Sequence, residues 1–167
     1  DTLPEFLYHR DIRLVALGTG EERYESFLSW LQVSFPGKVW YFPGYSEQLA
    51  HWIEAGADIF LMPSRYEPCG LNQMYSLRYG TPPVVRRTGG LADTVEPWNP
   101  VAKKGTGFLF DHFTPQGLRW AIDTALKAFE DREAWTQLMK NGMEKDFSWE
   151  RQVGQYERLY GRLVRTG

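Results

Sequence analysis

The stretch MPSRYEPCGLNQMYSLRYG, residues 62–80, joins an apolar run to a helical pattern through a loop of polar residues. The apolar run 59–62 has the length and composition of a buried strand, and a helical spacing of apolar residues begins at Leu71. Between the two stand a carboxylate, Glu67, and the only cysteine of the chain, Cys69. The stretch therefore predicts a strand, a loop and a helix. The loop is either an ordinary surface connection or a binding loop whose backbone and carboxylate meet a ligand.

Short apolar runs alternate with helical patterns along the rest of the chain. These runs are apolar throughout, which is typical of a parallel sheet covered on both faces. We therefore predict an α/β fold with a doubly wound parallel sheet and right-handed crossovers, followed by two further helices around Trp135 and Val153. Such a pattern supplies a complete core, so we expect the chain to fold by itself. The predicted strands are 12–17, 39–42, 59–62, 84–85 and 108–110.

Length and composition limit the class of protein. A chain of 167 residues predicts one domain, and a net charge of -2 disfavours nucleic acid or an anionic membrane surface as a partner. One cysteine without a Cys/His cluster suits a reducing compartment and predicts no metal site. No apolar stretch approaches the ~18 residues of a membrane helix. The chain opens without a methionine, in a polar segment, residues 1–5, that we expect to lead directly into the first strand. We interpret it as a soluble piece of a longer protein.

All loops that contain candidate functional residues follow predicted strands. The carboxyl ends of parallel strands share one edge of a sheet, and the loops leaving them form the ligand crevice. At that edge we expect residues 18–20, 43–45, 63–70 and 86–90, whereas the opposite edge has only short turns of apolar residues, glycine and proline. Any ligand is therefore predicted at a single edge.

Two of these loops end at a predicted helix start. The first helical turn has unpaired backbone N–H groups and the positive end of the helix dipole, so the segment Gly70 to Asn72 suits an anion, and Gly70 lets that anion approach the backbone. Alternatively, the glycine serves only the chain reversal. Thr88 and Gly89 repeat the arrangement more weakly, with Thr88 as a candidate N-cap.

Glu67 lies so close to this helix start that it would repel an anion if it touched one. A carboxylate there suits sugar hydroxyls or a carbon that gains positive charge, unless it is only a surface acid paired with Arg65. Arg65, Arg86 and Arg87 suit phosphate contacts or an ordinary surface role. Tyr45, after the second strand, either stacks on a base or packs at the rim.

Other residues favour structural roles. Cys69 is expected to be a small buried filler. Trp98 is expected to be exposed and Trp40 lies in a strand, while the tryptophans on helical stripes are predicted to be core residues. These are Trp30, Trp52, Trp120, Trp135 and Trp149.

Residues 63–71, together with 79–82 and 86–95, resemble the C-terminal domain of bacterial glycogen synthases and plant starch synthases. Residues 17–20 and 146–149 extend the resemblance over nearly the whole chain. Enzymes of that family are two-domain glycosyltransferases of the GT-B fold. They move glucose from ADP-glucose, and in some cases UDP-glucose, onto an α-1,4-glucan with retention of configuration. The resemblance implies that residues 1–167 are a single Rossmann-like domain that binds the nucleotide sugar.

The resemblance also implies roles for individual residues. Glu67 would contact the donor glucose and serve the transition state, the amides of residues 70–72 would hold the diphosphate, and Tyr45 would stack on adenine. Cys69 would stand beside Glu67 in the substrate site without a nucleophilic role. Related glycosyltransferases carry a ribose-binding glutamate eight positions after the first, where this chain has Tyr75, so the ribose contacts stay unassigned.

The family also uses parts that lie outside this sequence. They are an arginine and a lysine after an earlier strand, and an acceptor-binding N-terminal domain. We therefore expect this chain to be inactive alone, to need no cofactor, and to belong to the cytoplasm of a bacterium or a plastid of a plant. Two alternatives remain. A dinucleotide-dependent oxidoreductase is disfavoured because Gly18-Thr19-Gly20 is not followed by the third glycine of its fingerprint, and a non-catalytic glucan-binding module would bind oligosaccharide but no nucleotide.

Overall fold

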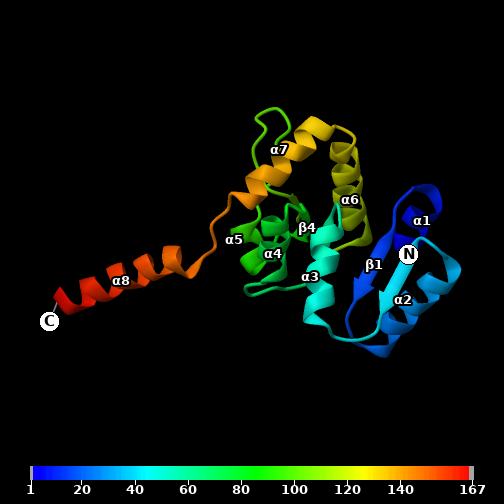
Figure 1. Ribbon diagram of the computed structural model, residues 1–167, viewed down its shortest axis with the longest axis horizontal. Coiled ribbons are helices and arrows are strands. Elements are labelled where there is room, and N and C mark those ends of the chain that lie inside the picture. Colours follow the sequence, from blue (N-terminus) through cyan, green and yellow to red (C-terminus); the bar gives the residue numbers. More distant parts are fainter. Residues whose placement is uncertain (1, 166–167) are drawn as a thin grey trace.

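The computed structural model describes residues 2–165, and its order of elements is that of an α/β protein (Figure 1). Each strand except the last is followed by one helix, and β5 is followed by the three helices with which the described chain ends. The elements are α1 (Thr2–His9), β1 (Leu14–Leu17), α2 (Glu22–Ser34), β2 (Val39–Phe42), α3 (Glu47–Gly56), β3 (Phe60–Met62), α4 (Asn72–Tyr79), β4 (Pro83–Arg86), α5 (Gly89–Thr94), β5 (Phe108–Phe110), α6 (Pro115–Phe129), α7 (Arg132–Met143) and α8 (Trp149–Arg165).

All five predicted strands are present and pair with one another in parallel, which confirms the fold class. The strands nevertheless form two sheets, β1–β2 and β3–β4–β5, where we expected one. β1 pairs with β2 from Leu14 opposite Val39 to Leu17 opposite Phe42. In Figure 1, β1 lies on the side of β2 that faces the three-stranded sheet.

The division leaves two central strands with an open edge. Among the described residues, β1 pairs only with β2, and β3 pairs only with β4. All three residues of β3 are half-buried and Val15 of β1 is 45% exposed, whereas the residues of β5 are all buried. In a doubly wound sheet of order 3-2-1-4-5-6, the first strand of the fold occupies the centre. The observed pairing is this order with its central position open.

Helices cover both faces of the three-stranded sheet. On one face, α6 packs Ala121 and Ala125 against a cluster that contains Val84 and Phe108. On the other face, Leu91 of α5 packs with neighbouring strand residues, Val85 and Leu109. Coverage from both sides explains why these strands are apolar at every position. A third cluster, which includes Leu31 of α2 and Val39 of β2, supports the smaller sheet.

The N-terminal segment is a helix, so our expectation that it leads directly into a strand is wrong. Phe6 and Leu7 of α1 are buried, and they belong to two different clusters. Leu3, Phe6 and Leu7 have the i, i+3, i+4 spacing of a helix, but the polar residues between them obscured the pattern. α1 thereby connects the core of the large sheet with the core of the small one.

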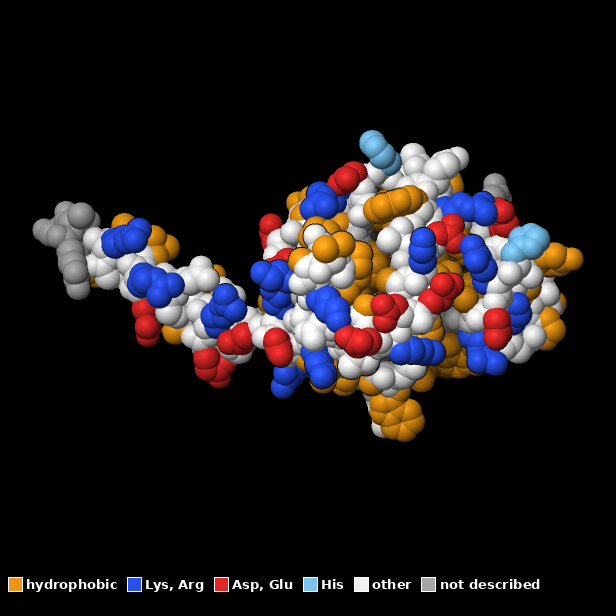
Figure 2. All heavy atoms as spheres, turned by 90° about the horizontal axis from the view of Figure 1, so that it is seen from above, with side chains coloured by type: hydrophobic (Ala, Val, Ile, Leu, Met, Phe, Trp, Pro, Cys, Tyr) orange, Lys and Arg blue, Asp and Glu red, His pale blue; other side chains and the backbone are white. Residues whose placement is uncertain are grey.

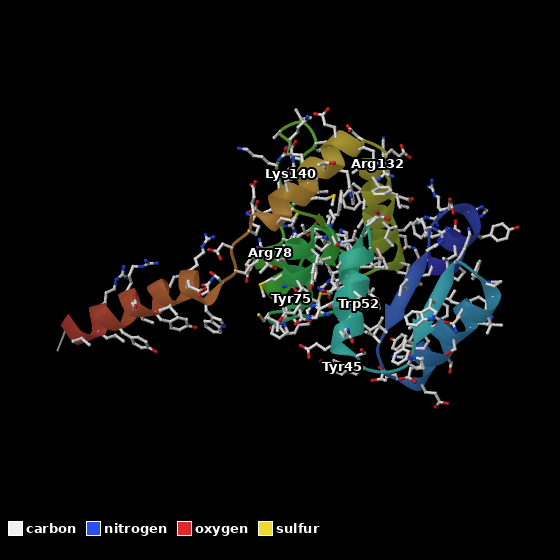
Figure 3. All side chains as sticks on the ribbon, viewed as in Figure 1. Tyr45, Trp52, Tyr75, Arg78, Arg132 and Lys140 are labelled. Atoms are coloured by element: carbon white, nitrogen blue, oxygen red, sulfur yellow. The ribbon has the colours of Figure 1, made fainter. Side chains whose placement is uncertain are left out.

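The prediction for the tryptophans is wrong at four of five positions. Trp135 is buried and stacks on Phe108, as expected of a core residue. In α3, by contrast, the buried position belongs to Glu54, whose carboxyl has a pKa raised by burial, while Trp52 faces outward (Figure 3). Trp98, expected to be exposed, packs against the large core. The other helical tryptophans are 51–75% exposed: Trp30, Trp52, Trp120 and Trp149.

The last helix, α8, extends away from the body of the molecule (Figure 1). None of the side chains described for it is buried, so it does not pack on the sheet, which was one of two alternatives. Its exposed apolar side chains recur at helical spacing: Trp149, Val153, Tyr156, Tyr160, Leu163 and Val164.

Figure 2 shows the face that is uppermost in Figure 1, where basic and acidic side chains are interspersed. Over residues 2–165, no helix has the length and apolar character to cross a membrane.

Candidate functional site

The loop between β3 and α4 rests on the first residues of α5. The Gly90 N–H donates to the carbonyl oxygen of Glu67 at 3.0 Å. A Cβ atom on Gly89 would lie 2.0 Å from that same oxygen, and a Cβ atom on Gly90 would lie 2.0 Å from the carbonyl oxygen of Cys69. Only glycine permits these backbone contacts. Gly89 thus has a structural role that the sequence did not indicate, and Thr88 precedes α5 without a side-chain capping bond.

Glu67 is half-buried, and its carboxylate has no ion pair or hydrogen bond among residues 2–165. The alternative of a surface pair with Arg65 is therefore not what the structure shows. Cys69 is exposed, so the expectation of a buried filler is wrong. Its thiol lies 3.5 Å from the carbonyl oxygen of Gly70. The loop therefore presents a carboxylate that no cation within residues 2–165 neutralises.

The start of α4 provides free backbone donors. Gly70 has a φ of 72°, in the left-handed region that favours glycine. Leu71 occupies the N-cap position with no side-chain cap, and Asn72 is the first helical residue. Within the described part of the chain, the N–H groups of these three residues donate to no protein acceptor. Because they also lie at the positive end of the helix dipole, they suit an anion.

A buried glutamine holds this loop from behind. Gln73 is fully buried, and its Nε2 donates to the carbonyl oxygens of Cys69 at 3.0 Å and Gly70 at 3.1 Å. Nε2 also lies 3.1 Å from the hydroxyl of Thr94, which in turn donates to the carbonyl of Gly90 at 2.6 Å. Sequence reasoning missed Gln73, because nothing in the pattern distinguishes a buried glutamine in a first helical turn from an exposed one.

Tyr45 stands at the neighbouring loop, directly before α3. Ser46 caps α3 by accepting a hydrogen bond from the Leu49 N–H at 3.2 Å, which fixes the helix start. The ring of Tyr45 is 86% exposed, so it is available for stacking and does not pack at a rim (Figure 3). α3 and α4 lie together, and the His51 ring meets Tyr75 edge-on at 5.3 Å. Tyr75 of α4 therefore contacts α3 while it stays 41% exposed.

The three arginines at this edge differ in whether their side chains already have a partner in the protein. Arg87 forms an ion pair with Asp111 at 2.8 Å. Arg86 donates to the carbonyl oxygen of Arg65 at 2.5 Å and lies over the ring of Phe113. The side chain of Arg65 has no partner among the described residues. Of the three, Arg65 is therefore the one most available to a ligand.

The described residues form two hollows, one beside the first of these loops and one away from them. A cavity of about 250 Å³ adjoins the first loop, where the Gly20 N–H donates to Glu25 at 2.7 Å and the Tyr41 hydroxyl donates to the Gly18 carbonyl at 3.0 Å. Burial, together with the charge of Glu25, raises the pKa of Tyr41, which keeps the phenol a donor. A larger hollow of about 370 Å³ lies at the end of α7, away from the loops. Two of the charged residues that line it, Lys145 and Glu96, form an ion pair.

Residues 2–141 match the family model described as glycosyl transferases group 1. The chain is 55% identical over 158 residues to a glycogen synthase of Anaeromyxobacter sp. (strain K), which covers 95% of this chain and 33% of that protein. It is 47% identical over 155 residues to the glycogen synthase of Geobacillus stearothermophilus, covering 93% and 32%. The chain thus spans about a third of the length of the curated relatives it matches.

The fold is also similar to solved structures. The catalytic domain of Starch Synthase IV from Arabidopsis thaliana, bound to ADP and acarbose, matches with a TM-score of 0.83 at 32% identity. That match covers 98% of this chain and 35% of the other. Sucrose-phosphate synthase from Thermosynechococcus elongatus matches with a TM-score of 0.73 at 24% identity, covering 99% and 42%, and shows the fold alone.

Proposed function

The chain belongs to the group 1 glycosyl transferases, and we propose that it is the donor-binding half of a glucan synthase that transfers glucose from ADP-glucose to an α-1,4-glucan with retention. One observation carries the proposal. Among the described residues, the single segment 63–72 contains a carboxylate without a partner, Glu67, and, three to five residues later, three backbone N–H groups without an acceptor. The relatives are bacterial glycogen synthases, so we place the enzyme in a bacterial cytoplasm.

The charges of this loop fit the charges of glucosyl transfer. As the bond between glucose and diphosphate breaks, the anomeric carbon becomes positive and the diphosphate gains negative charge. Glu67 is available to stabilise the first, and the N–H groups of Gly70, Leu71 and Asn72 are available to stabilise the second. Preorganised groups of this kind are the largest single source of rate enhancement in many enzymes.

Two further roles complete the donor site. Tyr45 would stack on adenine from the neighbouring loop, since its ring is exposed and its helix start is capped. Arg65 would meet a phosphate oxygen, because its side chain is uncommitted. Gly89 supports the loop that carries Glu67, because a Cβ atom there would meet the Glu67 carbonyl oxygen, and Thr88, Gly89 and the exposed Cys69 would line the substrate site. UDP-glucose remains the alternative donor.

We also propose that residues 1–167 form one domain of a two-domain enzyme. The open central position between β1 and β3 suits a parallel strand from another part of the enzyme. The apolar face of α8 suits contact with an acceptor-binding domain. Both features leave apolar surface uncovered in the chain alone, and the relatives are about three times as long.

Replacing Tyr45 tests the stacking role. In the full-length enzyme that contains this chain, Tyr45→Ala should weaken ADP binding by about 1 to 3 kcal/mol, the usual loss when an aromatic platform for a base is removed. Tyr45→Phe should restore most of the affinity, because the ring stacks and the hydroxyl does not. Isothermal titration with ADP measures both. An equal loss in the two variants would assign the binding to the hydroxyl, and unchanged affinity in both would end the stacking role.

The isolated chain should make no glucan from ADP-glucose and should bind ADP weakly. The donor loop is present, but nothing in residues 2–165 excludes water from it or orients an acceptor. Chain extension of maltotetraose is followed over time, and ADP, NAD and maltotetraose are titrated in parallel. Glucan synthesis at the rate of an intact synthase would contradict the division of labour. Binding of NAD, or of maltotetraose without any ADP, would instead favour an oxidoreductase or a glucan-binding module.

A further inference from the structure

We propose that Gln73 is a positioning residue that aims the backbone N–H groups of Gly70 and Leu71 at the diphosphate of the donor. The proposal rests on the function proposed above and concerns the same site. It starts from an observation that the function itself does not explain. The amide nitrogen of a fully buried glutamine donates hydrogen bonds to the carbonyls of two consecutive loop residues.

The geometry of the peptide bond turns these contacts into an orientation. All described peptide bonds are trans, and in a trans peptide the C=O and N–H groups point in opposite directions. The carbonyl of Cys69 points at Gln73, so the N–H of Gly70 in the same peptide points away from it. The same holds for the carbonyl of Gly70 and the N–H of Leu71. Because Gln73 lies in the interior, both N–H groups are directed outward.

The neighbouring atoms dictate which end of the glutamine amide faces the loop. The carbonyl oxygens of Cys69 and Gly70 are acceptors only, so the NH₂ group must face them. The Thr94 hydroxyl gives its hydrogen to the Gly90 carbonyl, so towards Gln73 it is an acceptor as well, and the two hydrogens of Nε2 are shared among three acceptors. Thr94 thereby links the loop support to α5, on which the Glu67 backbone also rests. One partly buried network therefore orients both the amides and the carboxylate-bearing segment.

This arrangement requires Gly70 and leaves one polar atom unsatisfied. A Cβ atom on Gly70 would lie 2.4 Å from Oε1 of Gln73. Oε1 is buried without a hydrogen-bond partner among the described residues, which is costly for a group with no other function. An apolar residue of similar length would avoid that cost. It would also leave both carbonyls unpaired and free to rotate outward, where they would face the phosphate oxygens.

The test compares ligands that differ only in phosphate. In the full-length enzyme, Gln73→Met retains the length of the side chain and removes its donors. It should weaken ADP binding about tenfold to a hundredfold, the scale of one or two hydrogen bonds to a charged group. Adenosine binding should change less than about twofold, because adenosine makes no contact with these amides. KM for the donor should rise more than kcat falls.

Gln48→Met is the matched control. Gln48 is likewise the second residue of a helix, α3, but it is exposed. Its replacement should change the affinity for neither ADP nor adenosine. Thr94→Val removes the hydroxyl at constant shape, should show the same preference for ADP at smaller size, and remains informative if Gln73→Met does not fold.

The outcomes separate the two proposals. If the unmodified enzyme bound adenosine and ADP equally, the diphosphate site itself would be absent and the proposed function would fail. If it preferred ADP but Gln73→Met and Thr94→Val kept that preference in full, the positioning role would be overturned. A loss of equal size for ADP and adenosine would also overturn it, since that is the result expected of a purely structural residue.

Discussion

Replacement of Glu67 by alanine is expected to lower kcat of the full-length enzyme by about a hundredfold or more while ADP affinity stays nearly unchanged. The reason is the division of charge in the loop. In the proposed site the carboxylate would face a centre that becomes positive only as the glucosyl bond breaks, so it would stabilise the transition state more than the bound nucleotide. The diphosphate would depend instead on the backbone N–H groups of residues 70–72 at the start of α4, which the substitution leaves in place.

Glu67→Gln serves as the matched control because it keeps the shape and removes the charge. It should lose nearly as much turnover as Glu67→Ala. Steady-state kinetics with ADP-glucose and maltotetraose give kcat, and titration with ADP gives the affinity. Near-normal kcat in either variant would show that the carboxylate has no catalytic role. A parallel loss of ADP binding in both variants would show that Glu67 supports the nucleotide and does not act on the sugar.

Replacement of Gly90 by alanine is the second change with a large expected effect. The added Cβ would lie 2.0 Å from the carbonyl oxygen and 2.6 Å from the Cα of Cys69, and both atoms belong to backbone that cannot rotate aside. The loop must therefore shift by about 1 Å or more relative to α5. Displacements of about 1 Å at an active site cost about a hundredfold in rate. We expect a fall in kcat/KM of this size, together with about 1 to 3 kcal/mol of lost stability from overpacking.

Gly56→Ala provides the comparison for this substitution. A Cβ atom on Gly56 would meet nothing within 4 Å, and the residue ends α3, so alanine should be neutral or slightly stabilising there. Thermal unfolding and kinetics on both variants decide the matter. If Gly90→Ala retained full kcat/KM, the contact between α5 and the Glu67 loop would have no bearing on catalysis.

The fold was predictable wherever one local pattern coincided with one element. The runs 39–42 and 108–110 are strands with the predicted bounds. Each is a short run in which every residue is apolar. The family resemblance, carried by residues 63–71 and their neighbours, is confirmed by the match over residues 2–141. The division of the sheet was not predictable. It depends on which strands lie side by side, and the hydrophobic pattern of a strand does not name its neighbour.

The candidate site was predictable in its position and only partly in its construction. Parallel strands placed Tyr45, Glu67 and Gly70 in loops after consecutive strands, as expected from the topology. The roles of Gly89 and Gln73 depend on backbone contacts between segments distant in sequence, which spacing does not encode. The prediction that the tryptophans are buried was wrong for a related reason. On a short helix the buried stripe is narrow, and a large side chain at its margin, such as Trp52, faces outward.

The open edges of β1 and β3 affect how the chain behaves in solution by itself. Each edge presents a row of unpaired N–H and C=O groups, and such rows template pairing with any extended backbone that meets them. A copy of the chain can offer its own edge to another copy as readily as a central strand can fill the position. Self-association and correct assembly therefore compete for the same backbone groups, and the isolated domain should become turbid as its concentration rises, unless the remainder of the enzyme closes the sheet first.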